Sequence, residues 1–135
     1  MKINIQKMVI GGVVGTVLMT LVGLFVAPMM GMPKMNPAKM LAGEMGDIIA
    51  LGWMAHFMIG IILAGGYALV KSYLPGAGWL RGILYSIAPW LMAQLVVMPM
   101  MGMPLFSDTA AIAMGSLVGH VIYGASVGYI YPVKG

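Results

Sequence analysis

The sequence contains no cysteine, and only 7% of its 135 residues are charged. The absence of cysteine excludes disulfides, thiolate metal sites, iron–sulfur clusters and thiol nucleophiles. The low charge and an apolar content of 61% differ from those of a soluble domain, which is about a quarter charged and about half apolar. These values exclude a soluble enzyme domain and predict a membrane protein. The net charge of +4 is spread along an apolar chain, so we expect no nucleic-acid partner.

Four apolar stretches are each long enough to cross the roughly 30 Å of hydrocarbon in a bilayer. They cover residues 8–30, 48–70, 82–103 and 110–131, and prolines follow or end each of them. We therefore predict an all-α membrane protein in which residues 1–135 form a single domain of four transmembrane helices. The bilayer is its first expected partner.

The charged residues are divided unequally between the two sides of the predicted membrane. One side has Lys2, Lys7, Lys71, Arg81 and Lys134; the other has Lys34 and Lys39 with all three acids, Glu44, Asp47 and Asp108. The positive-inside rule then predicts a multi-pass protein of the bacterial cytoplasmic membrane with both termini in the cytoplasm. Asp47 and Asp108 precede the second and fourth spans, where we expect them to cap free backbone amides.

A hexapeptide in the first half of the chain recurs in the second half. Residues 28–33, Pro-Met-Met-Gly-Met-Pro, return unchanged at 99–104, and a histidine with small residues four and eight positions later occurs at His56 and at His120. These matches predict two tandem hairpins, repeat 1 at about residues 8–71 and repeat 2 at about residues 79–132. Because both hairpins enter from the same side, we expect a pseudo-twofold axis along the membrane normal.

His56 and His120 are the only histidines, and both lie well inside predicted spans. An ionisable side chain at such a depth is costly and normally faces the bundle interior with a partner, and neutral imidazole binds transition metals and haem iron. We predict that the two histidines, from the second and fourth helices, hold the iron of one b-type haem. Gly60 and Gly124, one turn after them, would leave a clear helix face for the macrocycle. Electron transfer, or redox or gas sensing, would then be the function, with a redox partner protein or a second copy of the chain as partner.

A packing role stays open beside the cofactor role. Small residues at four-residue spacing also let membrane helices approach closely, and a histidine in a span also hydrogen-bonds neighbouring helices. The protein would then be a non-catalytic accessory subunit of a membrane complex or a homo-oligomeric scaffold. A lipid or a quinone in the site is a further alternative.

Methionine accounts for 17 residues, most of them in the outer half of the predicted bundle. Because soft thioethers suit Cu(I), the duplicated motif predicts an alternative copper site at Met29, Met30, Met32, Met100, Met101 and Met103. Methionine is also a flexible filler of irregular packing around proline-interrupted helix ends. We favour this second interpretation of the motif.

Few other polar residues lie within the spans: Thr16, Thr20, Ser86, Gln94 and Ser126. They provide no nucleophile with its base, no phosphate loop and no paired intramembrane carboxylates, so we do not expect an enzyme. Pro89 is expected to kink the third span and to free a backbone carbonyl that Gln94 or water satisfies.

Three motifs point to a known family. They are Gly-Trp-x-x-His-Phe-x-Ile-Gly at residues 52–60, Leu-Pro-Gly at 74–76 and His-x-Ile-Tyr-Gly at 120–124. With them the chain resembles, over nearly its whole length, a family of small, uncharacterised bacterial membrane proteins with four helices. The resemblance implies the four-helix architecture and draws attention to both histidines, and it brings no assigned activity.

Overall fold

A computed structural model of the protein describes residues 3–133, so Lys2 and Lys134 of the predicted charge distribution lie outside the described residues. Four helices are long and apolar enough to cross a membrane: Ile5–Met29, Ile49–Tyr73, Gly78–Met100 and Ala110–Ile130. Their ends lie at most four residues from the predicted limits. No strand occurs in residues 3–133. The prediction of an all-α protein with four membrane-length helices is therefore confirmed.

Short helical segments divide the spans and their connections. The spans comprise α1 (Ile5–Leu21), η1 (Val22–Val26) and α2 (Ala27–Met29); α4 (Ile49–Val70) and η2 (Lys71–Tyr73); α5 (Gly78–Met92), η3 (Ala93–Val97) and α6 (Met98–Met100); and α7 (Ala110–Ile130). The connections between spans contain α3 (Pro37–Gly43) and η4 (Leu105–Ser107).

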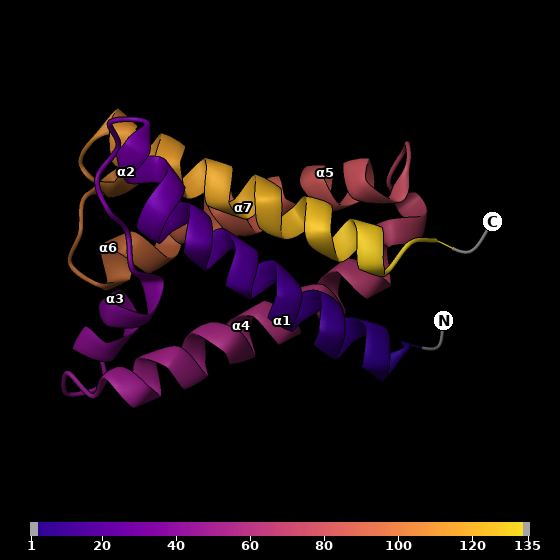
Figure 1. Ribbon diagram of the computed structural model, residues 1–135, viewed down its shortest axis with the longest axis horizontal. Helices are drawn as coiled ribbons and strands as arrows, with labels where there is room; N and C mark the ends of the chain where they lie inside the picture. The colour runs from indigo at the N-terminus through magenta and orange to yellow at the C-terminus, as the bar shows by residue number, and fades with distance from the viewer. Residues whose placement is uncertain (1–2, 134–135) are drawn as a thin grey trace.

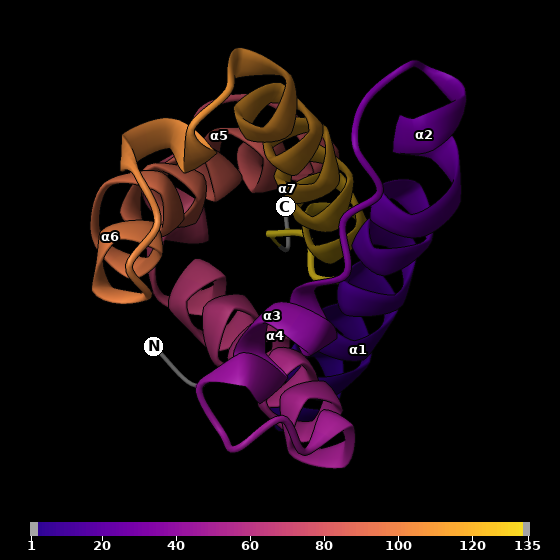
Figure 2. The same ribbon diagram turned by 90° about the vertical axis from the view of Figure 1, so that its left-hand side faces the viewer.

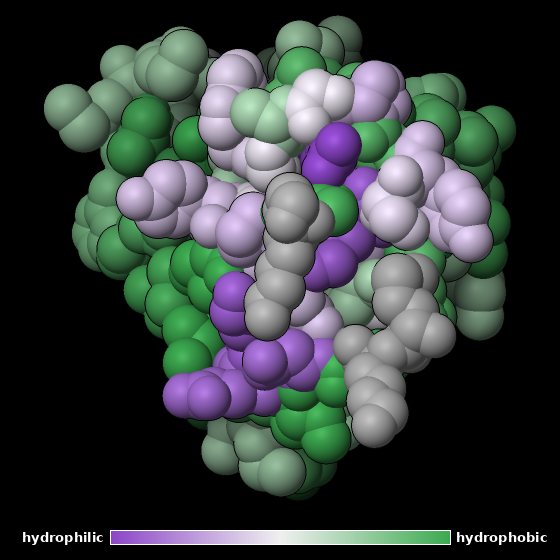
Figure 3. All heavy atoms as spheres, turned by 90° about the vertical axis from the view of Figure 1, so that its right-hand side faces the viewer, coloured by the Kyte–Doolittle hydropathy of each residue, from purple (hydrophilic) through white to green (hydrophobic). Residues whose placement is uncertain are grey.

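The helices form a bundle with two unlike ends. At one end, here called the proximal end, α1 begins and α7 ends, whereas α2, α3 and α6 gather at the opposite, distal end (Figure 1). Helix α7 packs against both α5 and α1, and α1 also packs against α4, whereas α4 has little contact with α5 or α7. Seen from the distal end, the helices are arranged in a ring (Figure 2). Hydrophilic side chains gather on the face at the proximal end (Figure 3).

Glycines set the closest helix contacts. A Cβ atom added to Gly82 of α5 or to Gly124 of α7 would collide with the carbonyl oxygen of the other residue, and Gly78 and Gly128 are paired in the same way. A Cβ at Gly12 of α1 would lie 2.6 Å from the Cα of Ile61 in α4. Small residues allow such backbone contact, which supplies the dispersion energy that holds helices together in lipid.

Tyrosines close the proximal half of the bundle. Tyr67 and Tyr123 belong to a buried cluster with Ala64, Ala68, Val127 and Tyr131. The hydroxyl of Tyr67 donates to Gly78 O (3.3 Å), that of Tyr85 donates to Leu63 O (2.9 Å), and that of Tyr123 donates to Gly60 O. Each bond joins two spans and satisfies a phenol that has no water partner in hydrocarbon.

Each half contains one π-helical turn at the same position relative to the repeated hexapeptide. In η1 the N–H of Ala27 bonds to Val22 O, and in η3 the N–H of Met98 bonds to Ala93 O. Each turn comes directly before the helical segment that contains the first proline of the hexapeptide, Pro28 or Pro99. Since proline has no N–H and its ring crowds the preceding turn, a π-helical turn accommodates it without ending the helix.

The expected role of Gln94 beside Pro89 is wrong. Pro89 lies inside α5, and the irregular turn of this span is η3, before Pro99. The side chain of Gln94 bonds to Ser107 and Ser116 in place of a backbone carbonyl.

The predicted caps at Asp47 and Asp108 are also wrong. The residue that precedes α4 is Ile48, which makes no side-chain cap, and α7 is capped by Thr109, whose hydroxyl accepts from the N–H of Ile112 at 3.3 Å. Asp47 and Asp108 have φ angles of 61° and 70°. Each aspartate therefore lies one residue before the N-cap position, which Ile48 and Thr109 occupy, and cannot cap the helix.

Helix α3 was not anticipated, although its start follows known capping rules. The side chain of Asn36 accepts from the N–H of Lys39 at 3.1 Å, and Pro37 occupies the first helical position. Ala38 and Ala42 are buried, and a Cβ at Gly52 would collide with Ala38 O. The short helix therefore lies firmly on the distal end of α4.

We expect Gly82→Ala to lower the free energy of unfolding by about 1–3 kcal/mol, because the added methyl group forces α5 away from α7. The measurement is unfolding in mixed micelles of increasing dodecyl sulfate, followed by circular dichroism. The matched control is Gly43→Ala, since a Cβ at Gly43 meets no atom within 4 Å. Equal midpoints for the two variants would contradict the assigned role of the α5–α7 contact.

Candidate functional site

A cavity of about 980 Å³ occupies the distal half of the bundle, and all four spans line it. Its polar lining includes His56, His120, Gln94, Ser107 and Ser116. Two exposed lysines, Lys34 and Lys39, also line it, and the exposed rim that they mark is here called its mouth. Seven methionines also line it: Met19, Met35, Met40, Met92, Met98, Met101 and Met103. No acid occurs among its described lining residues. The cavity is therefore apolar, with two imidazoles inside and positive charge at its mouth.

His120 is half-buried on α7 and presents one ring nitrogen to the cavity. Its Nδ1 lies 2.8 Å from the carbonyl oxygen of Ser116, one turn earlier. Because a carbonyl only accepts, Nδ1 carries the proton and donates it. The lone pair of the neutral ring is therefore on Nε2. This arrangement, a carbonyl holding one nitrogen while the other stays free, is typical of metal-ligating histidines.

His56 is buried on α4 and is held from α1. Its Nε2 lies 2.9 Å from Thr20 Oγ1, and the Thr20 hydroxyl donates to the carbonyl oxygen of Thr16 at 2.7 Å. Since the only hydroxyl proton is used on Thr16, the oxygen accepts from Nε2–H of His56. The lone pair of this imidazole is therefore on Nδ1.

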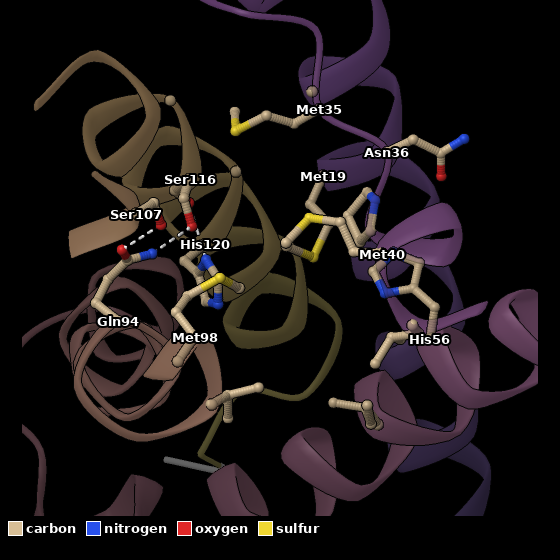
Figure 4. Close-up of a pocket in the computed structure, with 18 of the residues that line it drawn as sticks. Met19, Met35, Asn36, Met40, His56, Gln94, Met98, Ser107, Ser116 and His120 are labelled. Atoms are coloured by element: carbon tan, nitrogen blue, oxygen red, sulfur yellow. Dashed lines mark hydrogen bonds between the residues drawn. The ribbon is translucent and has the colours of Figure 1, made fainter. Parts of the chain in front are cut away.

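The structure brings the two histidines to one cavity. Figure 4 shows His56 and His120 on opposite walls, with the side chains of Met19, Met40 and Met98 entering the same space. His56 donates its N–H to Thr20 Oγ1, and His120 donates its N–H to Ser116 O. In each neutral ring the other nitrogen has a lone pair and no proton. The arrangement can accept protons or bind a metal ion.

Gly60 and Gly124, which we expected to leave a clear helix face for a macrocycle, lie in contacts between helices. Gly124 does not line the cavity, because it lies in the α5–α7 contact against Gly82. Gly60 does line it, and a Cβ there would collide with the side chain of Thr16 in α1. Close helix approach, the alternative interpretation of the sequence, describes the contacts of both residues.

The repeated methionine motif is not gathered around one point. Met29, Met30 and Met100 are 86%, 64% and 79% exposed, whereas Met101 and Met103 line the cavity. The remaining motif residue, Met32, lies near Gly115 of α7. The methionines that face His56 and His120 are mostly others, and no pattern in the sequence distinguished them.

A buried polar network supports the helix turn that carries His120. Ser107 Oγ donates to Gln94 Oε1 at 2.7 Å, and Gln94 Nε2 donates to Ser116 Oγ at 3.3 Å. Ser107 itself lies in a run of three residues, 106–108, with φ angles of 55°, 59° and 70°. This left-handed run is costly for residues with side chains, so the network must hold it in place.

The fold and the site define a class: an all-helical protein with four membrane-length spans around a distal cavity that two histidines share. The chain belongs to a family of unknown function, DUF6789, whose model matches residues 3–134. The expected membership of an uncharacterised family is thereby confirmed. No curated protein and no solved structure matches the chain. Within residues 3–133 no group of three or more histidine, cysteine or acidic side chains is placed to hold a metal ion.

We expect Gln94→Leu to loosen residues 105–109, because the buried Ser107 hydroxyl loses its acceptor at a cost of about 1–3 kcal/mol. Hydrogen–deuterium exchange of the Ser107 amide, which bonds to Pro104 O, should accelerate about tenfold or more. The control is Ser126→Ala, whose hydroxyl donates only to Ile122 O of its own helix. Unchanged exchange in Gln94→Leu would show that the network does not hold this turn.

Proposed function

We propose that the protein binds haem b in the distal cavity and serves in electron transfer or in redox or gas sensing. The observation that carries this proposal is the orientation of His120, whose Nδ1–H is fixed on Ser116 O so that Nε2 is free at the wall of a large apolar cavity. His120 and His56, from opposite walls, would hold the iron. Iron bound in this way supplies one-electron chemistry.

The dimensions and the lining of the cavity support this proposal. A volume of about 980 Å³ lies at the upper end of the range of about 300–1,000 Å³ that small-molecule and cofactor sites occupy. The walls are mainly methionine and aliphatic side chains, which exclude water from a bound macrocycle. The polar groups are few and converge from opposite sides, which is typical of cofactor sites.

Thr20 is the positioning residue for His56. Its hydroxyl holds Nε2–H and leaves the lone pair on Nδ1, so Nδ1 is the atom through which His56 would hold the iron. If His56 does not serve, a thioether from the same cavity would hold the iron in its place. The two single histidine variants separate these cases.

A second candidate is a copper-binding membrane protein, and the seven thioethers of the cavity lining favour it. Thioether and imidazole ligands together suit Cu(I). The ligands would come mainly from the cavity methionines, with Met101 and Met103 as the members of the repeated motif that share the site. Stoichiometric copper in purified protein without a Soret band would favour this candidate over haem.

We also propose that the two halves are duplicated hairpins related by a pseudo-twofold axis along the membrane normal. The support is a series of features at a constant offset of 71 positions: η1 and η3, α2 and α6, and the left-handed glycines Gly31 and Gly102. Both copies of the hexapeptide end a span at the distal end (Figure 1). The proposed limits of the repeats remain about residues 8–71 and 79–132.

The proposed location is the bacterial cytoplasmic membrane, with both termini in the cytoplasm. Of the described charges, Lys7, Lys71 and Arg81 belong to the proximal end, and all three acids belong to the distal connections. The positive-inside rule then puts the proximal end in the cytoplasm and opens the cavity toward the outer surface. A redox partner protein or a second copy of the chain would meet the protein in the membrane.

We expect His120→Ala to remove the low-spin haem spectrum and to lower haem occupancy at least about tenfold. The measurement is the oxidised and dithionite-reduced absorption spectrum of protein purified in detergent after expression with ample haem, with a pyridine haemochrome assay. His56→Ala should behave in the same way, whereas loss only in His120→Ala would indicate a histidine–methionine or five-coordinate iron.

Ser126→Ala is the control for these spectra, because this residue does not line the cavity. Wild-type protein with neither a Soret band nor copper would sink both candidates. The histidines would then be helix-packing residues of an accessory or scaffold protein.

The proposed orientation is testable because the chain has no native cysteine. Gly43→Cys, at the distal end, should react with a membrane-impermeant maleimide in intact spheroplasts. Ala77→Cys, in the proximal connection between η2 and α5, should react only after lysis, since both positions are exposed, lie outside the spans and belong to opposite ends of the bundle. The reverse pattern would invert the proposed topology.

A further inference from the structure

The connection between the first two spans lines the distal part of the cavity and is fixed at both ends. Residues 33–36, here called the strap, lead from the distal end of the first span to α3. The N–H of Met35 donates to Gly23 O at 3.1 Å. This carbonyl is free because the N–H of Ala27 bonds to Val22 O in the π-helical turn, and Pro28 has no N–H to offer. The strap is thus tied to η1 of the first span.

The other end of the strap is tied to α4 through α3. Asn36 caps α3, and the buried Ala38 and Ala42 hold this helix against Gly52. The strap therefore bridges two walls of the cavity, and its Met35 and Asn36 belong to the cavity lining. A loop fixed in this way presents its side chains to the cavity without first having to be ordered.

Lys34 of the strap and Lys39 of α3 bring positive charge to the mouth of the cavity. Both side chains are exposed, and both line the cavity. No acid is among the described lining residues, so no carboxylate neutralises the two ammonium groups within the cavity. The complementary ligand is amphipathic: its apolar body occupies the cavity, and its anionic groups remain at the mouth.

We infer that Lys34 and Lys39 bind the carboxylates of the ligand in this cavity, so that the propionate edge of the haem faces the distal surface. This inference rests on the proposed function. The opposite edge then points toward the floor of the cavity, where Tyr123 and Leu63 line it. Ammonium–carboxylate pairs at such a boundary are charge-assisted hydrogen bonds in a partly dry setting, and salt weakens them.

The test compares haem with haem dimethyl ester, whose carboxylates are masked, in titrations of detergent-purified protein. Wild-type protein should bind haem about tenfold more tightly than the ester at low salt, in keeping with two partly exposed ion pairs. The double variant Lys34→Gln/Lys39→Gln should bind both compounds with equal affinity. Its low-spin spectrum should be unchanged, because the histidines are intact.

Lys7→Gln is the matched control, since it removes one positive charge at the proximal end, away from the cavity. It should keep the preference for haem over the ester. Equal binding of both compounds by wild-type protein, or an undiminished preference in the double variant, would overturn the inference and leave the proposed function standing. If wild-type protein binds neither compound, the proposed function and this inference are both wrong.

Discussion

The hydrogen bond from Tyr123 to Gly60 O is the contact on which the arrangement of the bundle depends. It joins α7 to α4, two helices that otherwise have little contact, and it lies where the packed proximal half meets the hollow distal half. A phenol in hydrocarbon needs an acceptor, and the carbonyls near a glycine are the most accessible ones. Tyr85 bonds to Leu63 O in the same region, so the bonds that join α4 to α5 and α7 lie at the proximal side of the cavity.

The spans and the interior position of both histidines follow from the sequence because hydrocarbon penalises polar groups strongly. The residues that line the cavity cannot be predicted from the sequence in the same way. Met35 and Lys34 reach the site only because a π-helical turn frees the carbonyl of Gly23, and such a turn has no signature in composition. The spacing of Gly60 and Gly124 predicts close contact, yet it cannot tell a helix neighbour from a cofactor. The prediction of helix caps at Asp47 and Asp108 was wrong because both residues have a left-handed backbone conformation and lie outside the helices.

The two halves use equivalent positions in different ways. Gly23 in η1 and Gln94 in η3 are 71 positions apart, the offset of the repeated hexapeptide. The carbonyl of Gly23 accepts from the N–H of Met35 in the strap. The side-chain amide of Gln94 instead bonds to Ser107 and Ser116. One half therefore supplies positive charge at the mouth, and the other supplies the support of His120. The two sides of the site are therefore unlike, although both lie beside a copy of the same hexapeptide.

The π-helical turns change the direction that the residues after them face on the first and third spans. A π-helical turn amounts to one residue inserted into an α-helix, and one residue corresponds to a rotation of about 100° and a rise of about 1.5 Å. Without the extra residue in η1, everything from Ala27 onward would face another direction. The same holds for η3 and the residues after it. One extra residue therefore sets the direction that the distal ends of the first and third spans face. A one-residue deletion there would change the shape of the mouth more than most substitutions.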